Sequence, residues 1–189
     1  GAARLLCDRQ LGDEPQYRIG IWQVMAQAAQ DQFQRAQWQR KIRDAFLDTA
    51  GPDRLIAAET LGKLGYKPEE NETGAFADAA KSPYPDIAVY AQWVLADSGK
   101  AEDEKLLAAF LDSPREPTRM HAAYALRRLP TVSDETRRKL INVAEQEPAS
   151  SSARTCVLSA ALVHASEPQK ARWLKEELLK CLKAGGKDD

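Results

Sequence analysis

The chain has few of the residues from which catalytic and metal sites are usually built. It contains only two histidines, His121 and His164, which lie far apart in the sequence. Its three cysteines, Cys7, Cys156 and Cys181, are too widely spaced for a zinc site and too few for a disulfide framework, so we interpret them as free thiols. A metal site on one helix needs histidines at i and i+4, or a third ligand nearby. Neither pattern occurs, and we expect no metal and no cofactor.

Motifs that bind phosphate groups or activate a nucleophile are also missing. The sequence has no glycine-rich phosphate loop, no dinucleotide-binding fingerprint and no nucleophile elbow. Alternating apolar and polar runs, which are typical of strands, are absent as well. We therefore expect an all-α protein that is not an enzyme.

The chain carries neither a strong charge of one sign nor a long apolar run. Its net charge of −1 gives no global field that would attract nucleic acid. No stretch approaches the ~18 apolar residues of a membrane-spanning helix, and the N-terminus shows no signal-peptide pattern. The sequence leaves the compartment open between cytoplasm and periplasm. We expect the chain to be a fragment of a larger polypeptide whose upstream part could carry a targeting or membrane segment.

What the sequence does contain is one local pattern that returns five times. Each copy has four positions at spacing 0, 1, 4 and 7 that are mostly apolar, usually with an arginine three residues earlier and a proline before that. Successive copies begin 31 to 36 residues apart. Helical units repeated with such a period indicate a solenoid of stacked helix pairs. The quartets are Ile21, Trp22, Met25 and Ala28; Ala57, Ala58, Leu61 and Leu64; Ala91, Gln92, Leu95 and Ser98; Ala122, Ala123, Leu126 and Leu129; and Val157, Leu158, Ala161 and His164.

Prolines before the quartets and glycines after them mark helix ends, and amphipathic segments between the quartets predict the partner helices. The predicted helices are 2–11, 16–29, 33–48, 53–64, 70–81, 86–98, 103–112, 118–129, 134–146, 151–165 and 168–183. We expect one domain over 1–189, with repeats at roughly 2–29, 33–65, 70–98, 103–129 and 134–165 and a C-terminal capping helix over 168–183.

Two copies carry a resemblance to a known repeat. PDRLIAAETLGKLG (52–65) and PTRMHAAYALRRLP (117–130) begin with Pro-x-Arg, continue with small residues and leucine, and end at Gly or Pro; SARTCVLSAALVHA (152–165) follows more loosely. This combination resembles the HEAT repeat, in particular the short HEAT-like repeats of the phycobilisome-lyase type. The resemblance implies an armadillo-like, right-handed α–α superhelix, a HEAT-like solenoid of about five helix pairs.

The resemblance also implies a structural role for the arginines that precede the quartets, because the polar position at this point of such repeats tends to bridge neighbouring units. The inter-repeat candidates are Arg18, Arg54, Arg119 and Arg154. The third copy has Ala88 instead of an arginine and follows a long connection over 66–84. We expect irregular stacking around 82–98 and a bend in the connection.

A candidate binding surface follows from helix geometry. If positions 0, 1, 4 and 7 face the core, positions 2 and 6 lie on the opposite, commonly concave side. This places Trp93 and Tyr124 side by side in adjacent repeats, flanked by Arg128 and Glu59. Exposed aromatic residues beside arginine are typical of binding hot spots, so these four are candidate protein-binding residues. In the alternative, Trp93 is buried, because a small rotation of the irregular third copy would turn its ring into the core.

A second local feature is a group of five basic residues in two neighbouring predicted helices. It could bind phosphate, or it could form two solvated helix faces, which is the more ordinary explanation. The group consists of Arg127, Arg128, Arg137, Arg138 and Lys139.

The expected function is a non-enzymatic protein-interaction or scaffolding module. Its partner would be another protein or another domain of the same polypeptide. Among enzymes built on HEAT-like repeats, the two-iron hydroxylase of deoxyhypusine uses His-Glu dipeptides, and this sequence contains none. The alternative from another class is an accessory domain or subunit of a larger lyase, hydrolase or transporter. Nucleic-acid binding comes third, and steep salt dependence would reveal it.

Overall fold

The computed structural model describes residues 15–185, and within this range the chain is all-α. It forms ten α-helices and one short 3-10 turn, with no strand in the described residues. Their bounds are α2 (Pro15–Ala28), α3 (Gln32–Leu47), α4 (Arg54–Lys63), α5 (Thr73–Ala79), α6 (Pro85–Ala96), α7 (Ala101–Ala109), η1 (Phe110–Asp112), α8 (Glu116–Arg128), α9 (Asp134–Gln146), α10 (Arg154–Val163) and α11 (Pro168–Gly185).

Every helix predicted from residue 16 onward is present, with ends that differ by at most three residues; the helix predicted over 2–11 lies outside the described range. The expected end signals act as their chemistry predicts. Pro85 begins α6, where a missing N–H costs no intrahelical bond. Gly65 ends α4 with φ +62°, and the next amide, Tyr66 N–H, donates to Leu61 O at 3.0 Å. This is the left-handed C-terminal cap that glycine favours.

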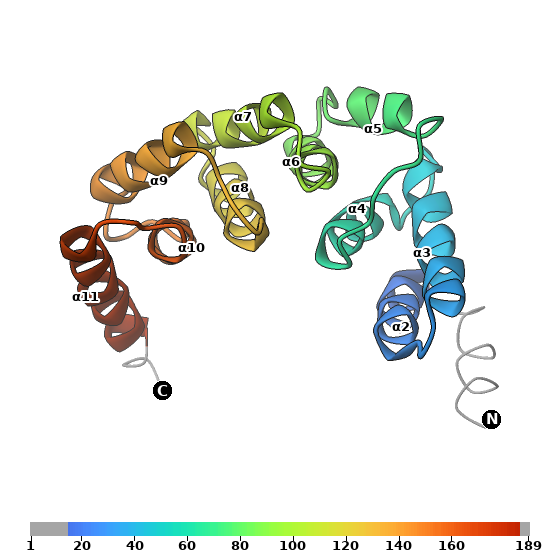
Figure 1. Cartoon of the computed structure of the whole chain (residues 1–189), viewed down its shortest axis with the longest axis horizontal. Coiled ribbons are helices and arrows are strands. Elements are labelled where there is room, and N and C mark those ends of the chain that lie inside the picture. The colour runs from blue at the N-terminus through green and yellow to red at the C-terminus, as the bar shows by residue number, and fades with distance from the viewer. Residues whose placement is uncertain (1–14, 186–189) are drawn as a thin grey trace.

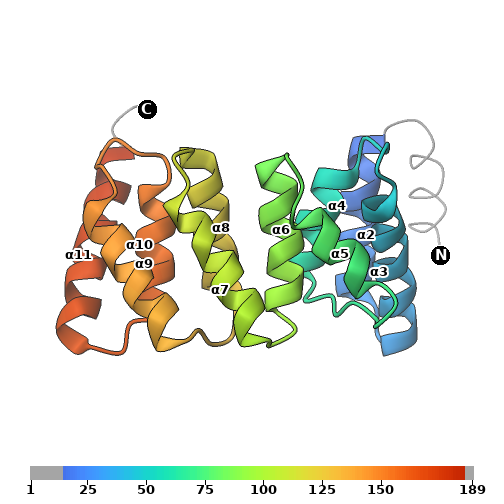
Figure 2. The same cartoon turned by 90° about the horizontal axis from the view of Figure 1, so that it is seen from above.

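The helices pack in sequence order and form two layers (Figures 1 and 2). Helices α2, α4, α6, α8 and α10 pack one after another along the inner side, and α3, α5, α7 and α9 cover them on the outer side. The layers curve into an arch, so the inner helices lie along its concave side and α2 and α11 at its two ends (Figure 1). A surface along the inner helices can therefore draw on side chains from several helices.

Alanine pairs at the first two quartet positions let the inner helices approach closely. Ala57, Ala58, Ala122 and Ala123 are fully buried, as are the leucines that follow them at the third position. The first copy departs from this pattern. In α2 the quartet Ile21, Trp22, Met25 and Ala28 is half-buried or exposed, whereas Ile19 and Ala26 are buried. Among the described elements, the close packing partners of α2 are α3 and α4, so the face that it buries differs from that of helices with an inner helix on each side.

Around the third copy, where irregular stacking was expected, the outer helix α5 has only seven residues and does not pack closely against α7, whereas the inner helix α6 is packed on both sides. Helix α6 lies between α4 and α8 and is buried at every residue from Ala88 to Ala96. The hypothesis that Trp93 is an exposed binding residue is wrong, because its side chain is only 1% exposed. Its ring lies against Gly62 of α4, where a Cβ atom would come within 2.3 Å of the indole. The absence of a side chain at Gly62 is what gives the large ring room between two helices.

None of the helices between residues 15 and 185 combines the length and the apolar character that crossing a membrane requires.

Candidate protein-binding site

Helix α8 presents the centre of the candidate site. Its buried residues, among them Ala122 and Leu126, face the neighbouring helices. His121, Tyr124 and Arg128 follow at spacings of three and four residues, which places them on one stripe of the helix. His121 and Tyr124 are half-buried and Arg128 is exposed, so this stripe forms the accessible face of an inner helix.

Buried aromatic residues of α6 support this stripe from below. Trp93 meets Tyr124 edge to face, with ring centroids 5.7 Å apart and an interplanar angle of 87°. Tyr90 lies 5.2 Å from the His121 ring, and His121 Nδ1 is 2.9 Å from Asp86 Oδ1. Burial, together with the negative charges of Glu59 and Asp86, raises the pKa of Tyr90 above its ordinary value, so this phenol stays neutral at physiological pH. The contacts hold the rings of the adjacent inner helices α6 and α8 in fixed positions.

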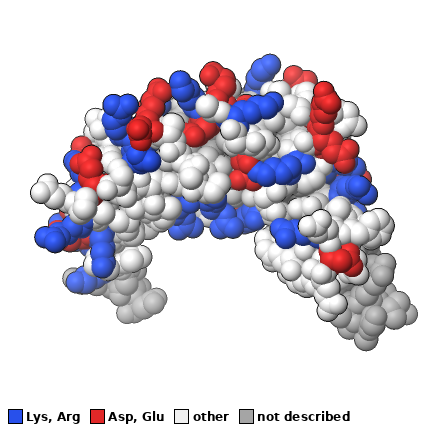
Figure 3. Space-filling model, viewed as in Figure 1, with Lys and Arg blue, Asp and Glu red and all other residues white. Residues whose placement is uncertain are grey.

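Two arginines lie over these rings. The Arg128 Cζ atom is 5.7 Å from the Tyr124 centroid and 6.0 Å from that of Trp93, and Arg127 Cζ is 5.6 Å from Tyr124. Arg127 also donates to Ser159 Oγ of α10 at 3.2 Å. Neither guanidinium forms an ion pair with a carboxylate of the described residues. Figure 3 shows Lys and Arg gathered on the underside of the arch, whereas its outer edge carries both signs of charge.

Glu59, the fourth candidate, does not join the arginines. Its carboxylate pairs with Lys63 on the same helix at 2.6 Å. The structure therefore brings Tyr124 and Arg128 together at the surface, places Trp93 beneath them, and leaves Glu59 on α4 with a partner of its own. Val163 of α10, which lies at position 6 of its copy as Arg128 does, is 59% exposed and gives the next inner helix an exposed apolar side chain.

Three of the four inter-repeat candidates bond to the next unit of the stack. Arg18 Nε in α2 donates to Asp53 Oδ2 at 2.8 Å, directly before α4. Arg119 in α8 donates to both carboxylate oxygens of Glu147, at 2.9 and 2.6 Å. Arg154 donates to Glu177 Oε2 of α11 at 2.8 Å.

Arg54 departs from the expected inter-repeat role. Its Nε donates to Phe46 O at 3.2 Å, and its guanidinium lies over the Phe46 ring. Both contacts are within its own helix pair, because Arg54 begins α4 and Phe46 is near the end of α3. The residue before Arg54, Asp53, makes the contact with the neighbouring helix pair by accepting a hydrogen bond from Arg18 of α2.

The basic group of α8 and α9 is split by the fold. Arg127 and Arg128 lie on inner helix α8, whereas Arg137, Arg138 and Lys139 lie on outer helix α9. Arg137 pairs with Asp134, Lys139 Nζ is 2.5 Å from Asp112 Oδ2, and Arg138 donates to the Asp134 carbonyl. The structure therefore forms no single five-residue cationic site.

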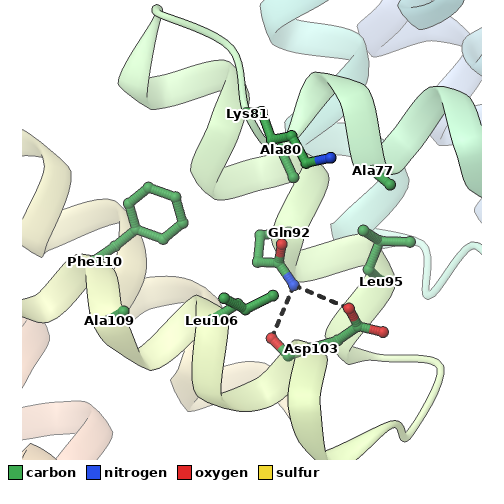
Figure 4. Close-up of a pocket in the computed structure, with 9 residues that line it drawn as sticks. All are labelled: Ala77, Ala80, Lys81, Gln92, Leu95, Asp103, Leu106, Ala109 and Phe110. Atoms are coloured by element: carbon green, nitrogen blue, oxygen red, sulfur yellow. Dashed lines mark hydrogen bonds between the residues drawn. The ribbon is translucent and has the colours of Figure 1, made fainter.

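A cavity of about 430 Å³ lies on the outer side, between the short helix α5 and α7 (Figure 4). Gln92 of α6 forms its floor, and its Nε2 donates to Asp103 O at 2.9 Å and to Asp103 Oδ1 at 3.3 Å. Gln92 thus fills a core position of the quartet with a side chain whose amide hydrogens are bonded. The apolar walls of the cavity are formed by Ala77, Ala80, Leu95, Leu106, Ala109 and Phe110.

Residues 15–185 contain no group of three or more His, Cys, Asp and Glu side chains arranged to hold a metal ion. His164 is half-buried, and its Nε2 lies 2.9 Å from Leu126 O.

His121 and Tyr90 also belong to the site, although the sequence pattern did not point to them. Tyr90 lies three residues before Trp93, and His121 lies three residues before Tyr124. Extending the same helical stripe by one turn toward the N-terminus would have included both.

Comparisons with protein-family models, with curated proteins and with solved structures found no match to this chain. The fold therefore stands on the structure itself, as an all-helical domain with sequential packing.

Proposed function

We propose that this chain is a HEAT-like α-solenoid that acts as a non-enzymatic protein-interaction module and binds its partner along the inner helices. The site is the cluster of Tyr124, Arg127 and Arg128, with Trp93 and Tyr90 as its buried support. A carboxylate-bearing segment of the partner would pair with the two guanidinium groups.

The spacing of the side-chain hydrogen bonds supports the solenoid. These bonds join residues at most 11 positions apart or residues 23 to 38 positions apart, with nothing longer among the described residues. The second range is about one repeat, so each unit bonds to its neighbour and to no more distant one. Contacts limited to neighbouring units are what stacked repeats produce.

The observation that carries the proposed site is the pair of arginines. A guanidinium placed over aromatic rings loses little further freedom when it binds, and aromatic residues beside arginine make common binding hot spots. Arg127 and Arg128 hold this arrangement without a carboxylate partner in the described structure. Other arginines of the stack, such as Arg119 and Arg154, already have one.

The test is capture of a partner from the source lysate with wild type and with Arg127→Glu/Arg128→Glu. We expect the double variant to lose a partner that wild type retains, at an unchanged melting temperature, and we expect crosslinks from that partner to map to α8 and α10. Arg138→Glu is the matched control, because Arg138 is exposed on the outer helix α9 and should leave capture unchanged.

Equal capture by the double variant and wild type would reject the site. A partner that crosslinks to the outer helices would move the interface away from the concave side. Retention of short DNA duplexes that falls steeply with salt, and is lost in the double variant, would instead assign the two arginines to phosphate binding.

A further inference from the structure

The cavity that α5, α6 and α7 line is independent of the inner-helix site (Figure 4). Its walls come mainly from α5 and α7, which belong to the outer layer (Figure 1). It exists because α5 has only seven residues and, among the described residues, does not pack closely against α7. The outer layer is therefore open here, and the outward face of α6 forms the floor. Its volume of about 430 Å³ is within the range of small-molecule sites, which are mostly apolar with a few polar groups.

Gln92 is the polar group that points to a ligand. The residue is only 3% exposed, and both hydrogen bonds of its side chain use Nε2 as donor to Asp103. Figure 4 shows the amide oxygen on the other side of the group, directed into the cavity. Among the described residues no donor bonds to this Oε1 atom, so the floor of an apolar cavity offers one fixed acceptor.

The rest of the lining limits the charge of the ligand. Lys81 and Asp103 contribute one charge of each sign, and the remaining walls are alanine, leucine and the Phe110 ring. A bound cation or anion would lie near one side chain of its own sign and one of the opposite sign, so the lining favours neither. A flat aromatic molecule fits beside Phe110 and buries apolar surface against Leu95 and Leu106.

We propose that this cavity binds a small, neutral, aromatic molecule with one N–H or O–H group, which donates a hydrogen bond to Gln92 Oε1. The site does not depend on the protein-binding role proposed for α8, and either can fail without the other.

The probe is indole, titrated into the full chain with ¹³C-labelled methyl groups and followed by NMR. We expect saturable shifts at Ala77, Ala80, Leu95 and Leu106, and none at Val163. Benzofuran has the same bicyclic shape with an oxygen in place of the N–H. It should bind about fivefold more weakly, because this factor corresponds to the net free energy of one neutral hydrogen bond.

Two variants of α7 locate the binding. Ala109→Phe fills the cavity from its wall and should abolish the shifts. Ala101→Phe changes another exposed alanine of α7 that does not line the cavity, and it should leave the affinity unchanged. The absence of saturable shifts in wild type would overturn the proposal, as would equal binding to the two variants. Equal affinity for indole and benzofuran would overturn the role of Gln92.

Discussion

At the scale of single residues, the molecule depends on how side-chain size is matched between adjacent inner helices. Trp93 is the largest fully buried side chain, and it fits because the residue facing it on α4 is Gly62. The sequence pattern placed Trp93 on the open side of its helix, but the glycine opposite it provides a space for the ring. Arg128 and Tyr124 remain accessible because they lie one repeat further along, above that ring.

This fit predicts opposite effects for two glycine-to-alanine changes. Gly62→Ala places a methyl group 2.3 Å from the Trp93 ring and should destabilise the fold by about 1–3 kcal/mol through overpacking. Gly20→Ala is the control, because Gly20 lies in α2 with no atom near its Cβ position and should stabilise the helix by roughly 0.5–1 kcal/mol. Urea denaturation of both variants checks this, and equal midpoints would contradict the close contact at Gly62.

At the scale of elements, the predictability of a helix depends on how many of its sides are covered. Helix α9 packs with one face, and the bounds expected from its apolar stripe, 134–146, match those of the structure to the residue. Helix α6 is covered by α4, α5, α7 and α8 and is apolar nearly all round. A helix buried on all sides has no stripe that distinguishes core from surface. For this reason the sequence predicted where α6 lies but not whether Trp93 is buried.

The connection from α9 to α10 is held by a largely buried ion pair, which predicts a pH dependence. Hydrogen bonds from Arg119 and Ser151 hold the pKa of Glu147 below its ordinary value of 4.5, although burial of the carboxylate acts in the opposite direction. The folded state therefore binds this proton less readily than the unfolded chain. The pair contributes its full stability above about pH 4.5 and loses it as the pH falls below that value.

Glu147→Gln should lower the free energy of unfolding by about 3 kcal/mol at pH 7, because Arg119 is left without its charged partner. The difference from wild type should shrink as the pH is lowered below 4.5, which chemical denaturation across pH 3 to 7 would measure. Glu135→Gln, at an exposed pair with Lys105 of 3.3 Å, is the control and should change stability by less than about 0.5 kcal/mol. A constant difference between Glu147→Gln and wild type at all pH values would argue against a charged pair.

At the scale of the whole molecule, sequential packing makes stability a local property. Side-chain hydrogen bonds of the described residues reach no further than 38 positions, and α2 and α11 lie at opposite ends of the arch. Elements at one end therefore depend on those at the other only through the helices between them. Opening of the terminal units without the rest is the behaviour expected of such an arrangement.

Truncation of a core leucine at the C-terminal end tests this. Leu174→Ala removes a fully buried side chain of α11 and should cost about 2–5 kcal/mol locally. Amide hydrogen exchange should accelerate in α10 and α11 and remain unchanged in α3 and α4. Leu182→Ala, at a position of the same helix that is 60% exposed, is the matched control and should change neither end. Faster exchange in all helices would show that the chain unfolds as one cooperative unit.

The sequence by itself determined the helices and their order, because apolar periodicity, prolines and capping residues act within one or two turns of the chain. It also predicted that Tyr124 and Arg128 share a helix face, since that follows from their spacing. Only the tertiary structure decided that Trp93 is buried, that Arg54 bonds within its own repeat and that the outer layer opens over Gln92. These features depend on which residue of a neighbouring helix stands opposite. The local pattern of the sequence carries no information about that contact, whether the opposing residue is 8 positions away, as Phe46 is from Arg54, or 31 positions away, as Gly62 is from Trp93.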